Sequence, residues 1–296
     1  MRRVPAVAVI VIVLTAACSS PDRSGPTERA STTPGATSSG PSGQSDATPA
    51  ADLVEGKFDV GGHELYLRCA GTDAPTIVYL HGSIPDPAFA GHSSALAIQD
   101  ILDEDHRMCV YDRANVGLSD SIDGPLDGAS SVTDLHRLLE TAGVEPPYVL
   151  LPASFGGLIA DIYAATYPDE VVGMVQLDTV VPRTEEAMER FIPEQDRLQA
   201  GDWIGTNEEL DELAVYAQAI ALERDLPAIP MTYLASDDPA PDPREDAAWR
   251  ALLEEFVDRF SPGRLIYVDA PHYMEPEIPA RIAEEVERLI AAVDAG

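Results

Sequence analysis

Ser154 stands in a stretch of sequence that could hold a serine hydroxyl ready for nucleophilic attack. An apolar, β-rich run over residues 148–151 leads into Pro152, and Gly156 and Gly157 follow the serine. A strand that turns this sharply into a helix leaves little room for side chains, and glycine adopts unusual backbone angles at low cost. The first N–H groups of such a helix are free to bind an oxyanion. The stretch therefore predicts a nucleophile elbow, with Pro152 standing where the motif G-x-S-x-G has its first glycine.

Strand-like and helix-like segments alternate along the chain and would position this serine. The later strand-like runs are apolar throughout, which is typical of a parallel sheet covered on both faces. The last helical segment has Ile282, Val286 and Leu289 on one face, with acidic residues between them. The expected strands are residues 57–60, 64–69, 76–81, 107–112, 148–151, 172–177, 229–235 and 264–268, and the expected helices are residues 93–102, 131–142, 157–167, 247–260 and 280–293. The alternation predicts an α/β domain with helices on both faces of the sheet.

Residues 182–226 interrupt this alternation. The segment is acidic and helical in character, it has no strand pattern, and it follows the sixth expected strand. An insertion at this place would either form a small helical lid over the strand ends or cover one edge of the sheet. We expect a lid.

The N-terminal segment predicts export. Two arginines precede an apolar run over residues 4–17, which as a helix would span about 21 Å, short of the roughly 30 Å hydrocarbon core of a bilayer. We therefore expect residues 1–17 to be a cleaved signal peptide. The residues LTAA before Cys18 resemble a bacterial lipobox, so Cys18 is a candidate lipidation site, and an ordinary secretory signal is the alternative. Residues 18–52, rich in Ser, Thr, Pro and Gly, predict a disordered tether.

The remaining residues, 53–296, suit a single domain, and the chain is strongly acidic. The sequence has 51 acidic and 19 basic residues, with a net charge of −32. That field repels nucleic acid and anionic lipid head groups, so we expect neither as a partner. The cysteines are too far apart for a ligand knuckle and no HExxH motif occurs, so we expect no metal site and no cofactor.

Five segments make the chain similar to the α/β-hydrolase family along nearly the whole domain. They are YLHGSI after the third expected strand, YDRANVGLSD after the fourth, PASFGG at the elbow, IPMTYLASDD at the seventh and VDAPHYMEPEIP after the eighth. The resemblance implies a mostly parallel eight-stranded sheet flanked by helices. It also implies a serine hydrolase that cleaves an ester or amide bond of a small molecule through an acyl-enzyme, with esterase, peptidase and lactonase activities all open. A serine at the elbow argues against dehalogenases and epoxide hydrolases, which use an aspartate nucleophile.

The resemblance assigns the three roles of a catalytic triad. Ser154 matches the nucleophile, and His272, in the loop after the eighth strand, matches the general base. The acid that orients the base follows the seventh strand in the family's usual order, which favours Asp238. Asp178, after the sixth strand, and Asp237 are the alternatives, in that order.

The same resemblance implies an oxyanion hole built from backbone N–H groups. One donor is Phe155, directly after the nucleophile. The other is Ser83, in the turn after the third strand, with Ile84 as the alternative. We expect Asp112 and Arg113, in the loop after the fourth strand, to make structural hydrogen bonds and to take no part in catalysis.

Cys69 and Cys109 are the two cysteines beyond Cys18. An even pair in an exported protein predicts a disulfide, although two buried free thiols would also fit these strand-like runs. In the α/β-hydrolase fold the second and fourth strands are neighbours, which favours the disulfide.

A second function class follows from Pro152. A proline at this place could misplace Ser154 and leave a catalytically weak binding lipoprotein with a hydrolase fold at the cell surface. A solute-binding lipoprotein of a transport system would share the tether, but it would leave the elbow and the His272 loop unexplained. We expect an exported hydrolase held at the outer face of the cell membrane through Cys18, with secretion as the alternative.

Overall fold

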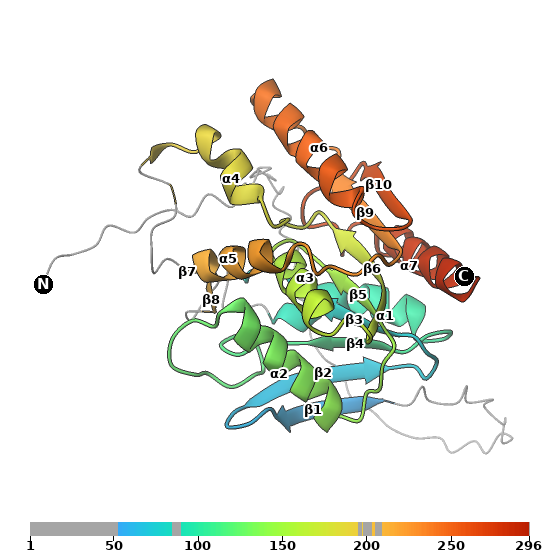
Figure 1. Cartoon of the computed structure of the whole chain (residues 1–296). Helices are drawn as coiled ribbons and strands as arrows, with labels where there is room; N and C mark the ends of the chain where they lie inside the picture. The colour runs from blue at the N-terminus through green and yellow to red at the C-terminus, as the bar shows by residue number, and fades with distance from the viewer. Residues whose placement is uncertain (1–52, 85–89, 195–196, 198–202, 205–208, 296) are drawn as a thin grey trace, which may run out of the picture. The chain divides into compact units, whose positions relative to one another are not determined.

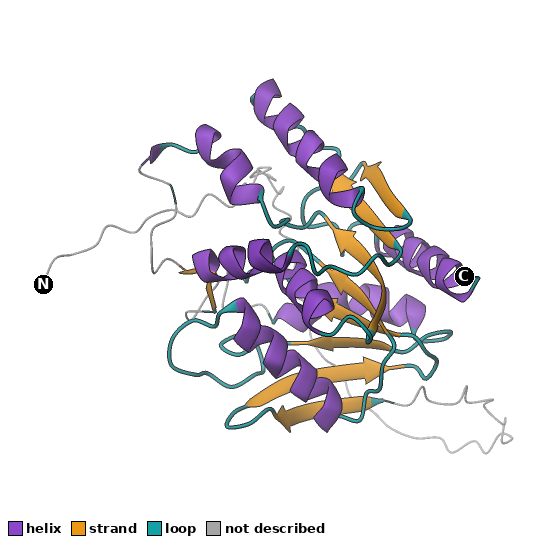
Figure 2. Cartoon of the chain, viewed as in Figure 1, coloured by secondary structure: helices purple, strands orange, loops and turns teal. Residues whose placement is uncertain are grey.

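The computed structural model describes residues 53–84, 90–194, 197, 203–204 and 209–295 of the 296-residue chain. Within these residues, eight strands form one large sheet with helices on both faces (Figure 1, Figure 2). The expected signal peptide (1–17), Cys18 and the expected tether (18–52) lie outside the described residues. In the part of the chain that the structure describes, no helix has the length and apolar character needed to cross a membrane.

The large sheet is mostly parallel, as expected. Its strands lie in the spatial order β1-β2-β4-β3-β5-β6-β9-β10, in which β1–β2 and β2–β4 are antiparallel and the other neighbours are parallel. The strands are β1 (Val54–Asp59), β2 (Glu64–Ala70), β3 (Thr76–Leu80), β4 (Met108–Tyr111), β5 (Tyr148–Pro152), β6 (Val171–Leu177), β9 (Met231–Ser236) and β10 (Gly263–Val268).

Helices bury both faces of this sheet. Those on one face are α2 (Gly128–Thr141), α3 (Gly156–Thr166) and α6 (Pro243–Val257). Those on the other face are α1 (Leu96–Leu102) and α7 (Pro279–Asp294). The 3-10 helix η1 (Gly91–Ala95) directly precedes α1. Central strands supply side chains to both layers. In β3, Val78 and Leu80 lie in the first core, and Ile77 and Tyr79 lie in the second. This two-sided burial explains why the strand is apolar throughout.

Helix α6 begins earlier than its apolar pattern predicts. The periodicity indicated residues 247–260, whereas the helix covers Pro243–Val257. The side chain of Asp242 accepts a hydrogen bond from the N–H of Arg244, and Pro243 occupies the first turn, where no N–H is needed. The Asp-Pro pair, and not the apolar stripe, sets the start of this helix.

The insertion between β6 and β9 is mainly helical, as expected, but it also contains a short strand pair. Its helices are α4 (Thr184–Met188), η2 (Glu189–Phe191) and α5 (Glu212–Leu222). The prediction that it holds no strand is wrong, because β7 (Trp203–Ile204) pairs with β8 (Leu210–Asp211). Strands of two residues are too short to produce an alternating pattern in the sequence.

The disulfide expected between Cys69 and Cys109 is present. It joins the neighbouring strands β2 and β4, on which the two cysteines are directly paired. The cysteines are 40 residues apart, and closing a loop of that length stabilises the folded state by about 4 kcal/mol in the chain-entropy account.

Candidate active site

Ser154 lies at the sharp turn between β5 and α3. Its φ of +49° falls in the left-handed region, and its N–H donates to the carbonyl oxygen of Leu177 at 3.1 Å. A Cβ atom at Gly156 would lie 2.3 Å from the carbonyl oxygen of Leu80, so the turn requires glycine there. Pro152 is the last residue of β5 and is paired with Leu80 of β3. The elbow thus forms with a proline in place of its first glycine.

His272 connects Ser154 to a carboxylate. Its Nε2 atom lies 3.0 Å from Oγ of Ser154, and its Nδ1 atom lies 2.7 Å from Oδ2 of Asp178. A carboxylate accepts hydrogen bonds, so the neutral imidazole carries its proton on Nδ1 and leaves Nε2 free to accept the serine proton. This is the arrangement by which a general base activates a hydroxyl nucleophile.

The carboxylate that the structure brings to His272 is that of Asp178, the first alternative, and not that of Asp238, the preferred residue, or of Asp237. Asp178 follows β6 with a φ of +44°. Its second oxygen, Oδ1, accepts a hydrogen bond from the N–H of Ser236 at 3.0 Å. Both carboxylate oxygens are therefore fixed, one by the neighbouring strand β9 and one by the imidazole.

The two acids after β9 make other contacts. Asp237 directs its carboxylate to Arg250 on α6, with 3.1 Å between Oδ1 and Nη2. The backbone N–H of Asp238 donates to Oγ of Ser236 at 3.3 Å. The end of β9 thus contacts Asp178 through the Ser236 backbone and does not bring a carboxylate to His272.

The environment of His272 raises its pKa. Burial of the ring lowers the pKa, but the hydrogen bond and the negative charge of Asp178 outweigh burial, so the pKa lies above its ordinary value. The side chain of His272 is still 41% exposed, whereas that of Asp178 is 12% exposed. The imidazole can therefore be reached from solvent, while the carboxylate stays shielded.

A second carboxylate, Glu275, lies buried in the same loop as His272. It accepts a hydrogen bond of 2.7 Å from the hydroxyl of Tyr79, and its charge also raises the pKa of His272. Burial raises the pKa of Glu275 itself, more than Tyr79 and His272 lower it. Nothing in the sequence pattern singled this residue out, because its burial depends on β3.

Two backbone N–H groups near Ser154 have no acceptor within the described residues: that of Phe155, at the elbow, and that of Ser83, in the turn after β3. The turn that carries Ser83 touches the nucleophile, since a Cβ atom at Gly82 would lie 2.8 Å from its Cβ. The alternative donor, Ile84, is engaged elsewhere, with its N–H directed at Oε2 of Glu209 at 3.4 Å. The geometry therefore favours Phe155 and Ser83 as the pair that could bind an oxyanion.

Other histidines make structural contacts away from Ser154. His63 Nε2 lies 3.1 Å from Asp134, His92 Nδ1 lies 2.8 Å from Asp112, and His136 Nε2 lies 3.0 Å from Glu170. Asp112 also accepts the N–H of Leu118, so the loop after β4 makes structural hydrogen bonds.

The insertion reaches the elbow through α5. The ring of Tyr216 packs edge-on against the ring of Phe155, with 5.7 Å between their centroids.

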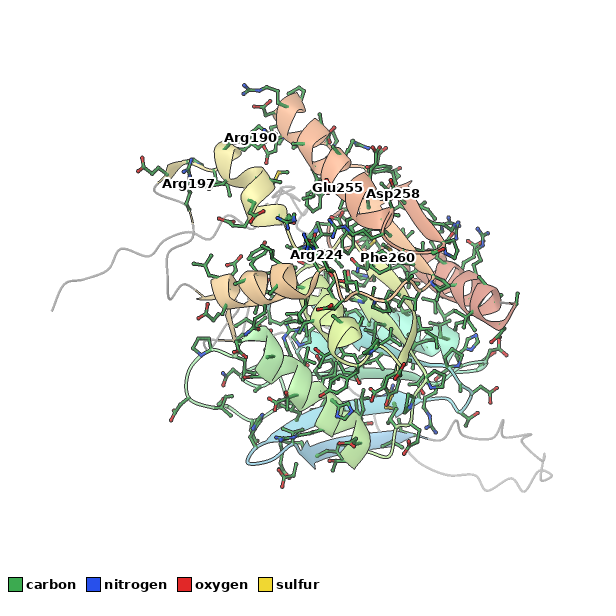
Figure 3. The ribbon with its side chains drawn as sticks, viewed as in Figure 1. Arg190, Arg197, Arg224, Glu255, Asp258 and Phe260 are labelled. Atoms are coloured by element: carbon green, nitrogen blue, oxygen red, sulfur yellow. A yellow bond between two sulfur atoms is a disulfide. The ribbon has the colours of Figure 1, made fainter. Side chains whose placement is uncertain are left out.

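A cavity of about 470 Å³ lies where Arg190 and Phe191 of η2 face Arg244 of α6. Figure 3 shows Arg190 between α4 and α6. Ser154, His272 and Asp178 do not line this cavity. Among the described residues, no group of three or more His, Cys, Asp or Glu side chains could hold a metal ion.

Sequence comparison identifies the family. A model of the alpha/beta hydrolase fold matches residues 75–259. The uncharacterized protein YbdG of Bacillus subtilis is 28% identical over 137 residues, which cover 45% of this chain and 41% of YbdG. The chain spans less than half the length of the curated relatives it matches.

Solved structures are similar over most of the chain. A thermophilic esterase from Thermogutta terrifontis has a TM-score of 0.56 at 20% identity, covering 81% of this chain and 98% of the esterase. A thioesterase domain from the curacin biosynthetic pathway has a TM-score of 0.57 at 12% identity, covering 79% of this chain and 99% of the domain. At these identities the likeness shows the shared fold.

Proposed function

The chain belongs to the α/β-hydrolase family, and from this premise we propose that it is a serine hydrolase that cleaves an ester or amide bond of a small molecule through an acyl-enzyme. The observation that carries the proposal is the hydrogen-bonded series Ser154–His272–Asp178 at the elbow, with distances of 3.0 and 2.7 Å. The esterase and thioesterase among the similar structures support a hydrolase.

In the first half of the reaction, Nε2 of His272 takes the proton of Ser154 while Oγ attacks the carbonyl carbon. Asp178 keeps the imidazole in the required tautomer and stabilises the imidazolium. The carbonyl electron pair moves onto oxygen, where the N–H groups of Phe155 and Ser83 donate. The bond to the leaving group then breaks, the leaving group takes the proton from Nε2, and the acyl group stays on Ser154.

In the second half, water repeats the path. Nε2 of His272 takes a proton from the water as its oxygen attacks the acyl carbon. The second tetrahedral intermediate collapses, its bond to Oγ of Ser154 breaks, and Nε2 returns the proton to Oγ. The raised pKa of His272 suits this role, because a stronger base accepts the proton more readily.

The alternative of a catalytically weak binding protein depends on Pro152 displacing the nucleophile. Oγ of Ser154 nevertheless lies within hydrogen-bond distance of Nε2 of His272. Pro152 precedes the left-handed residue Ser154 by two positions and still belongs to β5, where it pairs with Leu80 of β3. This arrangement favours an active hydrolase over a binding protein.

Labelling with a fluorophosphonate probe tests the proposal. We expect the wild-type protein and Ser130→Ala, a change at an exposed serine of α2, to be labelled, and Ser154→Ala to be unlabelled. A panel of p-nitrophenyl esters and aminoacyl anilides would then separate esterase from peptidase activity. Labelling that survives in Ser154→Ala would refute the proposed nucleophile, and an unlabelled wild type without turnover would favour the binding alternative.

We also propose that the protein is exported and anchored through a lipid on Cys18. The apolar run before Cys18 and the disulfide support export, since disulfides persist in oxidising compartments. With detergent phase partitioning of cells that express the full chain, we expect the wild type in the detergent phase and Cys18→Ser in the aqueous phase. Aqueous partitioning of the wild type would point to secretion.

A further inference from the structure

Arg113, Glu209 and His81 form a buried network at the turn over residues 81–84, which carries Ser83. This turn is named the oxyanion turn. Arg113 follows β4, His81 follows β3, and Glu209 comes from the insertion directly before β8. Their side chains are 2%, 0% and 0% exposed. The guanidinium is paired with the carboxylate, and its Nε donates to Oε1 of Glu209 at 2.8 Å. This deeply buried ion pair joins the insertion to the loop that follows β4.

Arg113 also holds the carbonyl groups that precede the donor Ser83. Its Nη1 donates to the carbonyl oxygen of His81 at 2.6 Å, and its Nη2 donates to that of Gly82 at 2.7 Å. A trans peptide unit is planar, so the carbonyl of Gly82 and the N–H of Ser83 point in opposite directions. Fixing the Gly82 oxygen toward Arg113 therefore directs the Ser83 N–H away from Arg113. Gly82 also lies against Ser154, so the nucleophile is close to this peptide unit.

The ring of His81 packs against the same peptide unit. Burial and the positive charge of Arg113 lower the pKa of His81 well below its ordinary value, so the ring is neutral. Its Nε2 accepts the backbone N–H of Arg113 at 3.3 Å. Its Nδ1 lies 2.7 Å from the carbonyl oxygen of Gly82 and 2.9 Å from Nη2 of Arg113. The ring thus packs against the hydrogen bond between Arg113 and the Gly82 carbonyl.

Glu209 holds the turn at both ends of Ser83. One oxygen of its carboxylate pairs with Arg113, which holds the preceding peptide, and the other accepts the N–H of Ile84 at 3.4 Å. Its own backbone is fixed, because its carbonyl oxygen accepts the N–H of Leu126 at 3.1 Å. A single carboxylate thus restrains the peptide units before and after the donor.

Stability alone is a poor explanation for this ion pair. Removing two charges from water is costly, and packed apolar residues in place of a buried ion pair are often as stabilising or more so. Apolar residues, however, could not orient the carbonyl oxygens of His81 and Gly82 or accept the N–H of Ile84. The polar contacts of Glu209 and Arg113 are those that fix the direction of peptide units.

We propose that Glu209 is a positioning residue of the oxyanion hole: a carboxylate of the insertion that sets the direction of the Ser83 N–H through Arg113 and Ile84. The inference rests on the proposed function, because an oxyanion hole matters only if Ser154 attacks a carbonyl group. It assigns the insertion a part in the chemical step, in addition to any part in covering the substrate.

Steady-state kinetics of Glu209→Gln test this role. The glutamine side chain has the size of the glutamate side chain but only one acceptor oxygen. It therefore cannot accept hydrogen bonds from both Arg113 and the N–H of Ile84 in the same geometry. We expect kcat for a p-nitrophenyl ester to fall by about 10- to 100-fold, since misplacing one oxyanion donor weakens an interaction made in the transition state. KM should change little, because the substrate carbonyl binds this donor weakly before charge develops on it.

The matched control is Glu223→Gln. Glu223 is another buried carboxylate of the insertion, 8% exposed, and it pairs with Arg183 at 2.9 Å and Arg259 at 2.6 Å. Its partners lie in other parts of the chain than the oxyanion turn, so kcat should stay within about 3-fold of the wild type. Equal losses of kcat in the two variants would assign Glu209 a merely structural role and overturn the proposal, as would wild-type kcat in Glu209→Gln.

The kinetics of Arg113→Lys and the binding of a boronic acid test the same role independently. Arg113→Lys preserves the charge but loses the planar fork, so it should lower kcat in the same way even if Glu209→Gln fails to fold. Affinity for a boronic acid transition-state analogue should fall by the same factor as kcat/KM, and unchanged affinity would contradict the proposal. Failure of the proposed function has a different signature, namely a wild type that neither turns over esters nor reacts with fluorophosphonate at Ser154.

Discussion

Two neighbouring parallel strands, β6 and β9, end at the same edge of the sheet, and carboxylates follow both. Asp178, after β6, is 12% exposed, and both of its oxygens are bound within the molecule. Asp237, after β9, is 58% exposed and pairs with Arg250 on α6. The left-handed backbone of Asp178 turns its side chain toward His272, and the N–H of Ser236 fixes it there. A place after a strand is therefore not sufficient for the acid, because the backbone must also turn the carboxylate inward.

Replacing Asp178 by asparagine should reduce kcat far more than the same replacement of Asp238. Asp178→Asn should lower kcat by about 10⁴-fold, because the amide no longer stabilises the imidazolium or its tautomer. Asp238→Asn should stay within about 2-fold of the wild type. Ester turnover by the two purified variants measures the difference, and a larger loss in Asp238→Asn would reverse the comparison.

The dependence of kcat/KM on pH measures how strongly Asp178 acts on His272. The neutral imidazole is the active form, so kcat/KM should rise with pH through the pKa of His272 and level off above it. Because Asp178 raises that pKa, the wild-type midpoint should lie above the ordinary value of about 6.5. In Asp178→Asn the effect of burial remains without the compensating charge, so the midpoint should move to lower pH. A midpoint that stays in place would show that Asp178 does not control the base.

A smaller effect is expected from the residue that links the two strand ends. Oγ of Ser236 donates to the carbonyl oxygen of Ala270, near His272, at 2.7 Å. Ser236→Ala removes this bond but keeps the backbone N–H that holds Asp178. We expect the free energy of unfolding to fall by about 1 kcal/mol, with a loss of kcat below 10-fold. A loss as large as that of Asp178→Asn would mean that the hydroxyl, and not the N–H, positions the acid.

The smallest effect is expected at the exposed end of β9. Asp237→Asn breaks a solvent-exposed ion pair with Arg250, so the free energy of unfolding should change by at most about 1 kcal/mol, and less at high salt. kcat should be unchanged. Urea denaturation at low and high salt, with ester turnover as the second readout, measures both quantities. A clear loss of kcat would place Asp237 in the site after all.

The parts of the site that were predictable from sequence depend on local chain geometry. Ser154 needs small residues at its turn, so residue types and spacing pointed to it, whereas His272 was assigned from the family resemblance. The family resemblance, which rests on five short motifs, supplied the fold and the neighbouring positions of Cys69 and Cys109. The sequence also indicated the apolar face of α7, since Ile282 and its neighbours recur at helical spacing and are buried.

The parts that were not predictable depend on contacts between distant segments. The choice of Asp178 over Asp238 is made by a left-handed backbone angle and by the N–H of Ser236, which is 58 residues away. Glu209 lies among many acidic residues of the insertion, and only the pairing with Arg113, which is 96 residues away, distinguishes it from them. No periodicity or motif encodes such pairings.

Trapping the acyl-enzyme tests whether Ser154 is the nucleophile. The protein is mixed with excess p-nitrophenyl acetate, quenched in acid during the first turnover, digested and mapped by mass spectrometry. We expect a burst of about one p-nitrophenolate per protein molecule and an acetyl group on Ser154, because acyl transfer to the serine releases the first product before water attacks. Turnover with no acyl group on Ser154, or with the acyl group on another residue, would contradict it.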